Sequence, residues 1–132
     1  MKRILFVFGF ILLAANIVSA QQKDASITVI DSTVHDFGNI KEIDGPVTYT
    51  FKIKNEGEKA LVVTKVVASC GCTSPDWTKE PIAPGQTGEI KVTYDPTNRQ
   101  GGPFTKTVSV YSNGKTGSLM LTIKGNVTPK QQ

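Results

Sequence analysis

Apolar and polar residues alternate with a period of two along most of the chain. In residues 47–54 every second side chain is aliphatic or aromatic, and the side chains between them are threonine or lysine. The same alternation recurs in residues 89–94, 107–110 and 119–127. This period is typical of a β-strand that buries one face and exposes the other. No stripe with the 3.6-residue period of a helix is seen, so the pattern predicts an all-β protein with antiparallel strands.

Turn-forming residues separate these runs. They are Asn55-Glu56-Gly57-Glu58, Asp95-Pro96-Thr97-Asn98, Gly101-Gly102-Pro103 and Asn113-Gly114. A strand region is also predicted over residues 27–30 and 34–40, with a turn around Asp31-Ser32. About seven to eight short antiparallel strands in about 110 residues predict an immunoglobulin-like β-sandwich. The Cys…Trp…Cys spacing of antibody domains is absent.

Two packed sheets would bury the apolar phase of each strand. The residues that we expect in the core are Tyr49, Phe51, Ile53, Ile90, Val92, Val108, Val110, Leu119, Leu121 and Ile123. Residues 61–67 are apolar in both phases, so they form either a central strand covered on both sides or a strand with a bulge. Residues 74–85 carry three prolines and are predicted to form a loop.

The first twenty residues have the pattern of a secretory signal peptide. Lys2 and Arg3 precede an apolar run over residues 4–17, and Val18-Ser19-Ala20 supplies small residues at a cleavage site. The run is shorter than the roughly 20 residues that span a bilayer, and no cysteine follows the cleavage site. We therefore expect cleavage after Ala20, a single mature domain over residues 21–132, and export to the periplasm or beyond.

Charge excludes some classes of partner. Removal of Lys2 and Arg3 leaves 13 basic and 11 acidic side chains, a net charge of +2. No basic run or basic helical face is present, which argues against a nucleic-acid partner. No other apolar segment is long enough to span a membrane, so no membrane association is expected after cleavage.

The two cysteines, Cys70 and Cys72, are separated by one glycine. In an extended strand their Cα atoms would be about 6.6–7 Å apart, and a disulfide usually needs about 4.4–6.8 Å. Gly71 gives the backbone freedom to close that distance, in a small ring that would be more reducible than a structural disulfide. Three interpretations stay open: a structural pair, as thiols or a local disulfide; a redox pair; and a Cu(I) or Zn²⁺ site. The structural pair is favoured, because redox thiols need positive neighbours and zinc needs four ligands.

Other candidate residues give weaker signals. His35 and Met120 are the only residues that could complete a metal site with the cysteines, and both are distant in sequence. A lone histidine beside a strand is more often a surface or hydrogen-bonded residue than a ligand or a base. No serine nucleophile elbow or paired catalytic set is present, so neither enzymatic activity nor a cofactor is expected. Trp77 is either an exposed binding anchor or a cover for one end of the core.

Five motifs in order resemble one bacterial family of domains of unknown function, numbered 1573, over residues 27–127. They are His35-Asp36-Phe37-Gly38-Asn39-Ile40, Tyr49 to Gly57, Ser69-Cys70-Gly71-Cys72-Thr73, Ile82-Ala83-Pro84-Gly85 and Val110-Tyr111-Ser112-Asn113. The resemblance implies a sandwich of seven to eight strands, related to ASH and major-sperm-protein-like domains. It also implies an exported protein of the kind common in Bacteroidota, with no established activity.

These observations favour a non-enzymatic interaction or scaffolding module whose protein partners are unidentified. Binding would use an exposed edge strand or the loop end from Cys72 to Trp77. The alternative is a thiol-redox or copper/zinc-handling protein that uses Cys70 and Cys72.

Overall fold

A computed structural model describes residues 24–131, so the predicted signal peptide lies outside the described residues. Eight strands account for most of this part. They are β1 (Ile27–Val29), β2 (Val34–Lys41), β3 (Val47–Asn55), β4 (Val63–Ala68), β5 (Thr73–Trp77), β6 (Thr87–Tyr94), β7 (Gly102–Ser112) and β8 (Ser118–Thr128). One short 3₁₀ turn, η1 (Glu42–Asp44), connects β2 to β3. None of the helical structure in this part is long and apolar enough to cross a membrane.

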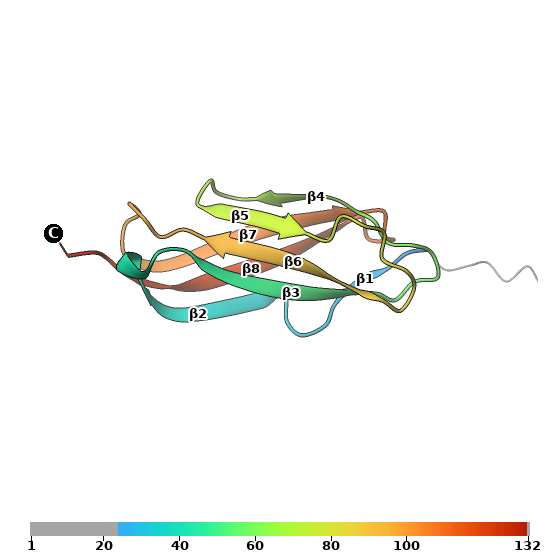
Figure 1. Cartoon of the computed structure of the whole chain (residues 1–132), viewed down its shortest axis with the longest axis horizontal. Helices are drawn as coiled ribbons and strands as arrows, with labels where there is room; N and C mark the ends of the chain where they lie inside the picture. The colour runs from blue at the N-terminus through green and yellow to red at the C-terminus, as the bar shows by residue number, and fades with distance from the viewer. Residues whose placement is uncertain (1–23, 132) are drawn as a thin grey trace, which may run out of the picture.

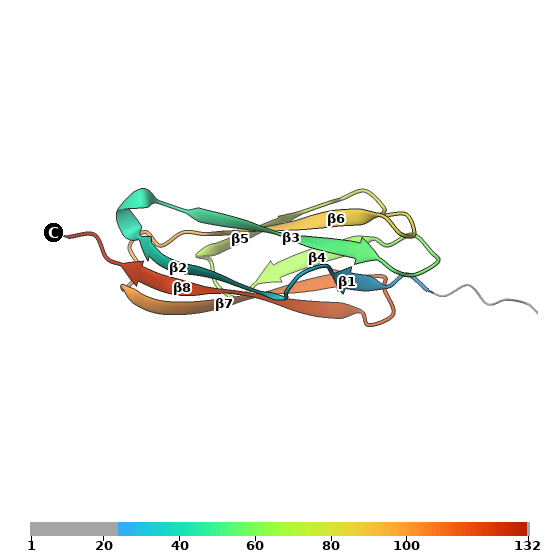
Figure 2. The ribbon, with the colours of Figure 1, turned by 90° about the horizontal axis from the view of Figure 1, so that it is seen from below.

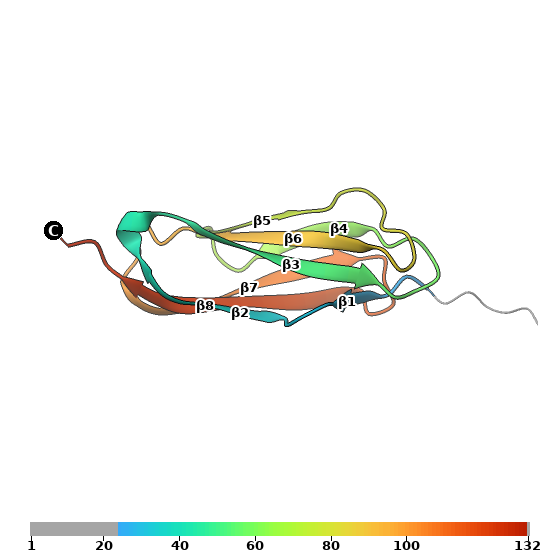
Figure 3. The ribbon, with the colours of Figure 1, turned by 60° about the horizontal axis from the view of Figure 1, so that its bottom comes forward.

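The strands form two four-stranded sheets that pack face to face as a sandwich. The first sheet has the order β1-β3-β6-β5 and the second has the order β2-β8-β7-β4. Figure 1 shows β4 and β5 along one side of the molecule and β2 along the opposite side. Figures 2 and 3 show the two layers. The predicted immunoglobulin-like sandwich is therefore confirmed, with strands at the upper end of the predicted number.

One pair of strands differs from the expected antiparallel arrangement. β2 lies parallel to β8, and the other pairs within both sheets are antiparallel. The alternation of side chains reports which face of a strand is buried, and it carries no information on strand direction. β2 is also interrupted by a bulge between Asp36 and Asn39, where Gly38 has a φ of 69° and donates its N–H to Asp36 Oδ1.

The core lies between the sheets and contains the predicted side chains. Eight of the ten expected residues are buried, and the other two, Tyr49 and Leu119, are half-buried against the same cluster. The Tyr49 ring lies at the border of the core, where His35 from the second sheet stacks on it with 3.6 Å between ring centroids. The alternation therefore identified which face of each strand is buried. Which residues lie at the border of the core depends on how the two sheets overlap, and the alternation does not report that overlap.

Two segments on one side of the sandwich differ from expectation. Residues 63–68 form β4, an edge strand, so the interpretation as a central strand is wrong. The predicted bulge is present, between Val63 and Lys65. Residues 73–77 form strand β5, so the prediction of a loop is wrong there. Pro75 is compatible with β5 because β5 is also an edge strand, where proline costs no ladder hydrogen bond on its outward side.

Asn55 holds one end of the sandwich together. Its side chain is fully buried. Its Oδ1 accepts hydrogen bonds from the N–H groups of Ser26, at 3.2 Å, and Gly57, at 2.9 Å. Its Nδ2 donates to the carbonyls of Lys59, at 2.7 Å, and Ile82, at 2.9 Å. One amide therefore joins the segment before β1, the connection from β3 to β4 and the loop before β6.

Candidate functional site

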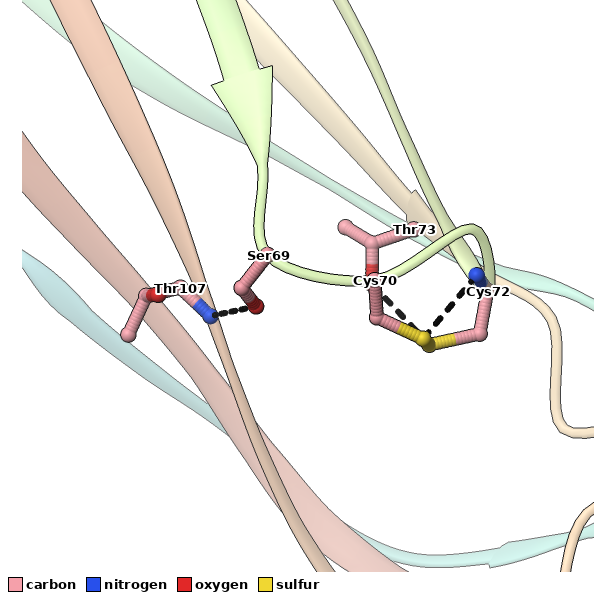
Figure 4. The surroundings of a disulfide bond; sticks show 5 residues. All are labelled: Ser69, Cys70, Cys72, Thr73 and Thr107. Atoms are coloured by element: carbon pink, nitrogen blue, oxygen red, sulfur yellow. Dashed lines mark hydrogen bonds between the residues drawn. A yellow bond between two sulfur atoms is a disulfide. The ribbon is translucent and has the colours of Figure 1, made fainter.

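The two cysteines form a disulfide in the turn that carries the chain from β4 in the second sheet to β5 in the first. Their Cα atoms are 5.2 Å apart, closer than in an extended strand. Figure 4 shows the small ring at the crossing. Just before it, the N–H of Ser69 donates to the carbonyl of Thr107, and the N–H of Thr107 donates to Ser69 Oγ. The turn is thereby fixed to β7.

Burial distinguishes the two cysteines. Cys72 is 2% exposed and belongs to the core, whereas Cys70 is half-buried at its border. The N–H of Cys72 lies 3.1 Å from Cys70 Sγ and donates to it. The carbonyl of Cys70 accepts the N–H of Thr73, and the carbonyl of Cys72 accepts the N–H of Asp95. Cys70 is therefore the more exposed residue of the pair.

The structure does not gather a metal site around the pair. The described residues contain no group of three or more histidine, cysteine, aspartate or glutamate side chains that could hold a metal ion. His35 stacks on Tyr49 and contacts Phe37 edge-on at 4.6 Å. Met120 lies on the outer face of β8 and is 57% exposed. In the disulfide state neither sulfur is a thiolate, so metal binding at this pair would first require its reduction.

Trp77 ends β5 and covers the border of the core. It pairs with Ile90 of β6 and packs, half-buried, against the core cluster. Lys79 Nζ lies 2.9 Å from the centroid of the Trp77 ring and 3.7 Å from Asp76 Oδ1. The indole is thus occupied by the core on one side and by a cation on the other. Trp77 was expected to be either an exposed binding anchor or a cover for one end of the core, and these contacts favour its role as a cover.

Two ionisable groups near the disulfide turn have shifted pKa values. Burial raises the pKa of Tyr94, the cross-strand partner of Thr73. Hydrogen bonds from the hydroxyl and the N–H of Thr97 lower the pKa of Asp95. The charge of Arg99 acts to lower both pKa values, and the shifts otherwise follow from local packing and turn geometry.

The edge strands differ in whether their outward backbone groups are available. The residues that flank β5 fix its orientation: the carbonyl of Cys72 accepts the N–H of Asp95, just after β6, and the N–H of Thr78 donates to the carbonyl of Glu89 in β6. By alternation, the backbone groups of Thr73, Pro75 and Trp77 point outward. The outward N–H of Thr73 donates to the carbonyl of Cys70, and that of Trp77 donates to Asp76 Oδ1. Pro75, between them, has no N–H. The β5 edge therefore offers no free donor to another strand.

β1 and β2 are also poor templates for a further strand. β1 has only three residues. Just before β2, the carbonyl of Thr33 accepts the N–H of Thr122 in β8, so the N–H of Val34 at the start of β2 points outward, where it donates to Ser32 Oγ. The bulge at Gly38 then interrupts the edge. Short strands, bulges and bonded donors are the usual means by which proteins block edge pairing.

β4 lacks such protection over its second half. The N–H of Ser69 points to β7, so by alternation Lys65 and Val67 also bond to β7, and Val66 and Ala68 point outward. Neither outward N–H has a hydrogen-bond partner within residues 24–131. Lys65, the one charged residue of β4, lies over the ring of Tyr111 at 4.6 Å from its centroid, on the β7 side. β4 is thus the open edge of the sandwich.

The outer faces of the two sheets differ in chemistry. The first sheet presents a charged and hydroxylated face, made of Thr48, Thr50, Lys52, Lys54, Ser74, Asp76, Thr87, Glu89, Lys91 and Thr93. The second sheet carries four of the six large hydrophobic side chains that are exposed in the described chain. These four, Val34, Val67, Tyr111 and Met120, form what we call the outer apolar patch. They occupy three neighbouring rows of the sheet, with serine and threonine between them.

Comparison with known proteins identifies the family. The model of the family described as "Protein of unknown function (DUF1573)" matches residues 28–127. The chain belongs to this family. The DUF1573 match covers all eight strands almost completely, which confirms the resemblance found in the sequence motifs. No curated protein sequence matches the chain.

Solved structures share the fold of this DUF1573 protein at low sequence identity. A protein of unknown function from Porphyromonas gingivalis aligns with a TM-score of 0.66 and 16% identity, over 84% of this chain and 51% of its own. The ASH/PapD-like domain 7 of human CEP192 aligns with a TM-score of 0.60 and 8% identity, over 83% and 89%. The VesB protease of Vibrio cholerae gives 0.56 and 19%, over 79% of this chain and 31% of its own. The chain spans about half the length of the first structure, and these likenesses concern the fold alone.

Sequence reasoning missed the features that distinguish the surfaces. The outer apolar patch combines residues from β2, β4, β7 and β8, which no local pattern connects. Its signal in the sequence is valine, tyrosine or methionine at positions where the polar phase of a strand is expected, as at Met120 between Leu119 and Leu121. The open edge of β4 required the strand order.

Proposed function

We propose that this protein is a non-enzymatic interaction module that works outside the cytoplasm and binds another protein through the outer apolar patch. The single observation that carries the proposal is the concentration of exposed large hydrophobic side chains on one sheet face, opposite a charged one. A concentration of exposed apolar side chains on one face of a small domain often marks a site of interaction. The pattern of residues 1–20 supports the location.

The chemistry of the patch restricts its partner. Val67 and Met120 share one row with Ser109 between them, and Tyr111 lies in the adjacent row beside Lys65. A partner that presents aliphatic side chains would bury Val67 and Met120, each about half exposed in the free protein. The only charge in these rows is that of Lys65, so an acidic residue of the partner would lie beside it. We therefore assign an apolar partner surface that carries a carboxylate at its border.

A charge placed in the patch tests the proposal. Met120→Lys adds a cation to an exposed position, so the fold is retained while the apolar contact is lost. Ser74→Lys is the matched control, since it adds the same charge to the exposed outer face of the first sheet. Tagged wild type and both variants are cross-linked in the native host and compared by quantitative mass spectrometry. We expect a set of proteins captured by the wild type and Ser74→Lys and lost with Met120→Lys. Equal capture by all three would refute the use of this face.

Thiol–disulfide exchange is a second candidate, favoured by the unequal burial of the two cysteine residues. A substrate thiolate would attack the Sγ of Cys70, the Cys70–Cys72 bond would break, and Cys72 would leave as a thiolate and take up a proton. A second substrate thiol would then displace Cys70, so that the substrate is oxidised to a disulfide and the cysteine pair is reduced.

Trapping decides between the candidates. The oxidised protein is incubated with reduced glutathione, quenched with acid and analysed by intact and peptide mass. Exchange activity predicts a mixed disulfide at Cys70 that forms faster than the same adduct on a denatured control. A protein that stays fully oxidised under these conditions would exclude the redox function and leave the interaction module.

A further inference from the structure

We infer that two copies of this chain pair antiparallel along β4, with Val67 opposite Val67 across a twofold axis, and so join their second sheets into one eight-stranded sheet. The open edge carries this inference. β4 has two outward N–H groups, those of Val66 and Ala68, without a partner in the described part of the chain, whereas the donors of the β5 edge are bonded internally. Unpaired edge groups are a template for a further strand.

The outward groups of β4 are complementary to themselves in one register. With Val67 at the twofold axis, Val66 of each copy lies opposite Ala68 of the other, and each such pair exchanges two hydrogen bonds. All four bonds fall in the regular half of β4, beyond the bulge between Val63 and Lys65. A register centred on Val66 would instead place Ala68 opposite the bulged residue Thr64, and it would lose two of the bonds.

Charge also permits this pairing. In the Val67 register, Lys65 lies opposite Ser69, so no two cations face each other across the axis. Lys65 is held over the Tyr111 ring on the neighbouring strand, away from the edge that it would otherwise guard. The side chains that meet at the axis are the two Val67 residues, each 48% exposed in the single copy. Their contact continues the outer apolar patch from one copy into the other.

The β5 edge is suited to the same arrangement. A twofold axis perpendicular to the joined sheet places both first sheets on one side, and β5, which contacts β4, faces its counterpart. Burial there would be costly if it enclosed unbonded donors. The outward N–H groups of Thr73 and Trp77 are already bonded, and Pro75 has none. The N–H donors of the β5 edge therefore need no new acceptor when the two copies meet.

The mass of the purified protein in solution tests the inference, measured by sedimentation equilibrium from about 1 to about 100 µM. We expect reversible formation of a species of twice the monomer mass. Val67→Lys places two cations opposite each other and is expected to weaken the dimer about tenfold or more. Met120→Lys is the matched control, because Met120 shares the row of Val67 and its exposure but lies two strands from the edge. This variant stays dimeric, although it loses the partner of the proposed function.

Opposite charges placed at Val67 in the two copies test the register. Val67→Glu alone is expected to be monomeric, and a mixture of Val67→Lys with Val67→Glu is expected to recover dimers that contain one copy of each. A wild type that stays monomeric over the whole range overturns the inference, and so does a Val67→Lys variant that dimerises as well as the wild type. Either result leaves the proposed function to the capture experiment with Met120→Lys, so the two proposals fail separately.

Discussion

Replacing Asn55 by alanine is expected to destabilise the protein more than any single change on its surface. The Asn55 amide uses its full hydrogen-bonding capacity, two accepted and two donated bonds, and all four partners are backbone groups. The side chain is fully buried. Asn55→Ala would therefore leave two N–H groups and two carbonyls without their partner in a region that water reaches poorly.

The magnitude follows from these four bonds. At a net contribution of about 1 kcal/mol each, their loss costs about 4 kcal/mol, and burial of the unpaired groups keeps the cost at the upper end of that scale. A domain of this size has a total stability of about 5–15 kcal/mol, so the variant would lose a large part of it. Asn126→Ala is the matched control, because Asn126 is exposed and makes one side-chain bond, to Asn39 at 3.2 Å. Its expected cost is about 0.5 kcal/mol.

Equilibrium unfolding in urea measures both variants, with the disulfide kept oxidised and fluorescence of Trp77 as the probe. We expect a lower midpoint for Asn55→Ala with an unchanged dependence of the unfolding free energy on urea. A loss no larger than that of Asn126→Ala would show that water replaces the amide at low cost. The conclusion that the Asn55 side chain holds one end of the sandwich together would then be wrong.

Three further predictions concern single positions. Gly57→Ala is expected to destabilise the fold by about 1–3 kcal/mol, measured in the same urea assay, because the added Cβ would collide with the carbonyl of Asp24. Thr97→Val removes the hydroxyl that lowers the pKa of Asp95, so an NMR titration of that carboxyl should move to higher pH. The hydrogen bond stabilises the fold above the usual aspartate pKa, and this stabilisation is lost as pH falls through the lowered pKa of Asp95. If Asp95 titrates in Thr97→Val as it does in the wild type, the Thr97 hydroxyl is not the cause of the lowered pKa. The raised pKa of Tyr94 predicts stability that is present below the usual tyrosine pKa and lost as pH rises through the raised one, and Tyr94→Phe should abolish this loss in thermal unfolding at alkaline pH.

The alternation of side chains was sufficient to predict the fold class, because burial of one face leaves a period-two pattern whatever the strand order. Residues 47–54 became β3 and the apolar phase of residues 89–94 became part of β6. Proline misled the prediction at β5, since Pro75 marks a loop in most contexts and is harmless only where its missing N–H would face outward. That distinction depends on strand order, which alternation does not report.

The surfaces were less accessible to prediction than the core. The motif that contains Asn55 and Gly57 was visible as a turn. The four hydrogen bonds of the Asn55 side chain, however, reach segments up to 29 residues away. The parallel pairing of β2 with β8 joins residues near the two ends of the described chain. Such pairings are set by the overlap of complete sheets, and no window of sequence contains both partners.

The position of β8 between β2 and β7 orders the events by which this chain reaches its native state. A chain made from its N-terminus has all four strands of the first sheet once Tyr94 is complete, but β2 has no neighbour in its own sheet until residues 118–128 exist. Until then, the core side chains of the first sheet, such as Phe51, Ile53 and Ile90, lack the cover that Leu121, Ile123 and Val127 of β8 provide. The last strand therefore closes the sandwich in one late step, and a segment that reaches those side chains earlier, such as a holding chaperone or another nascent copy, competes with β8 for them.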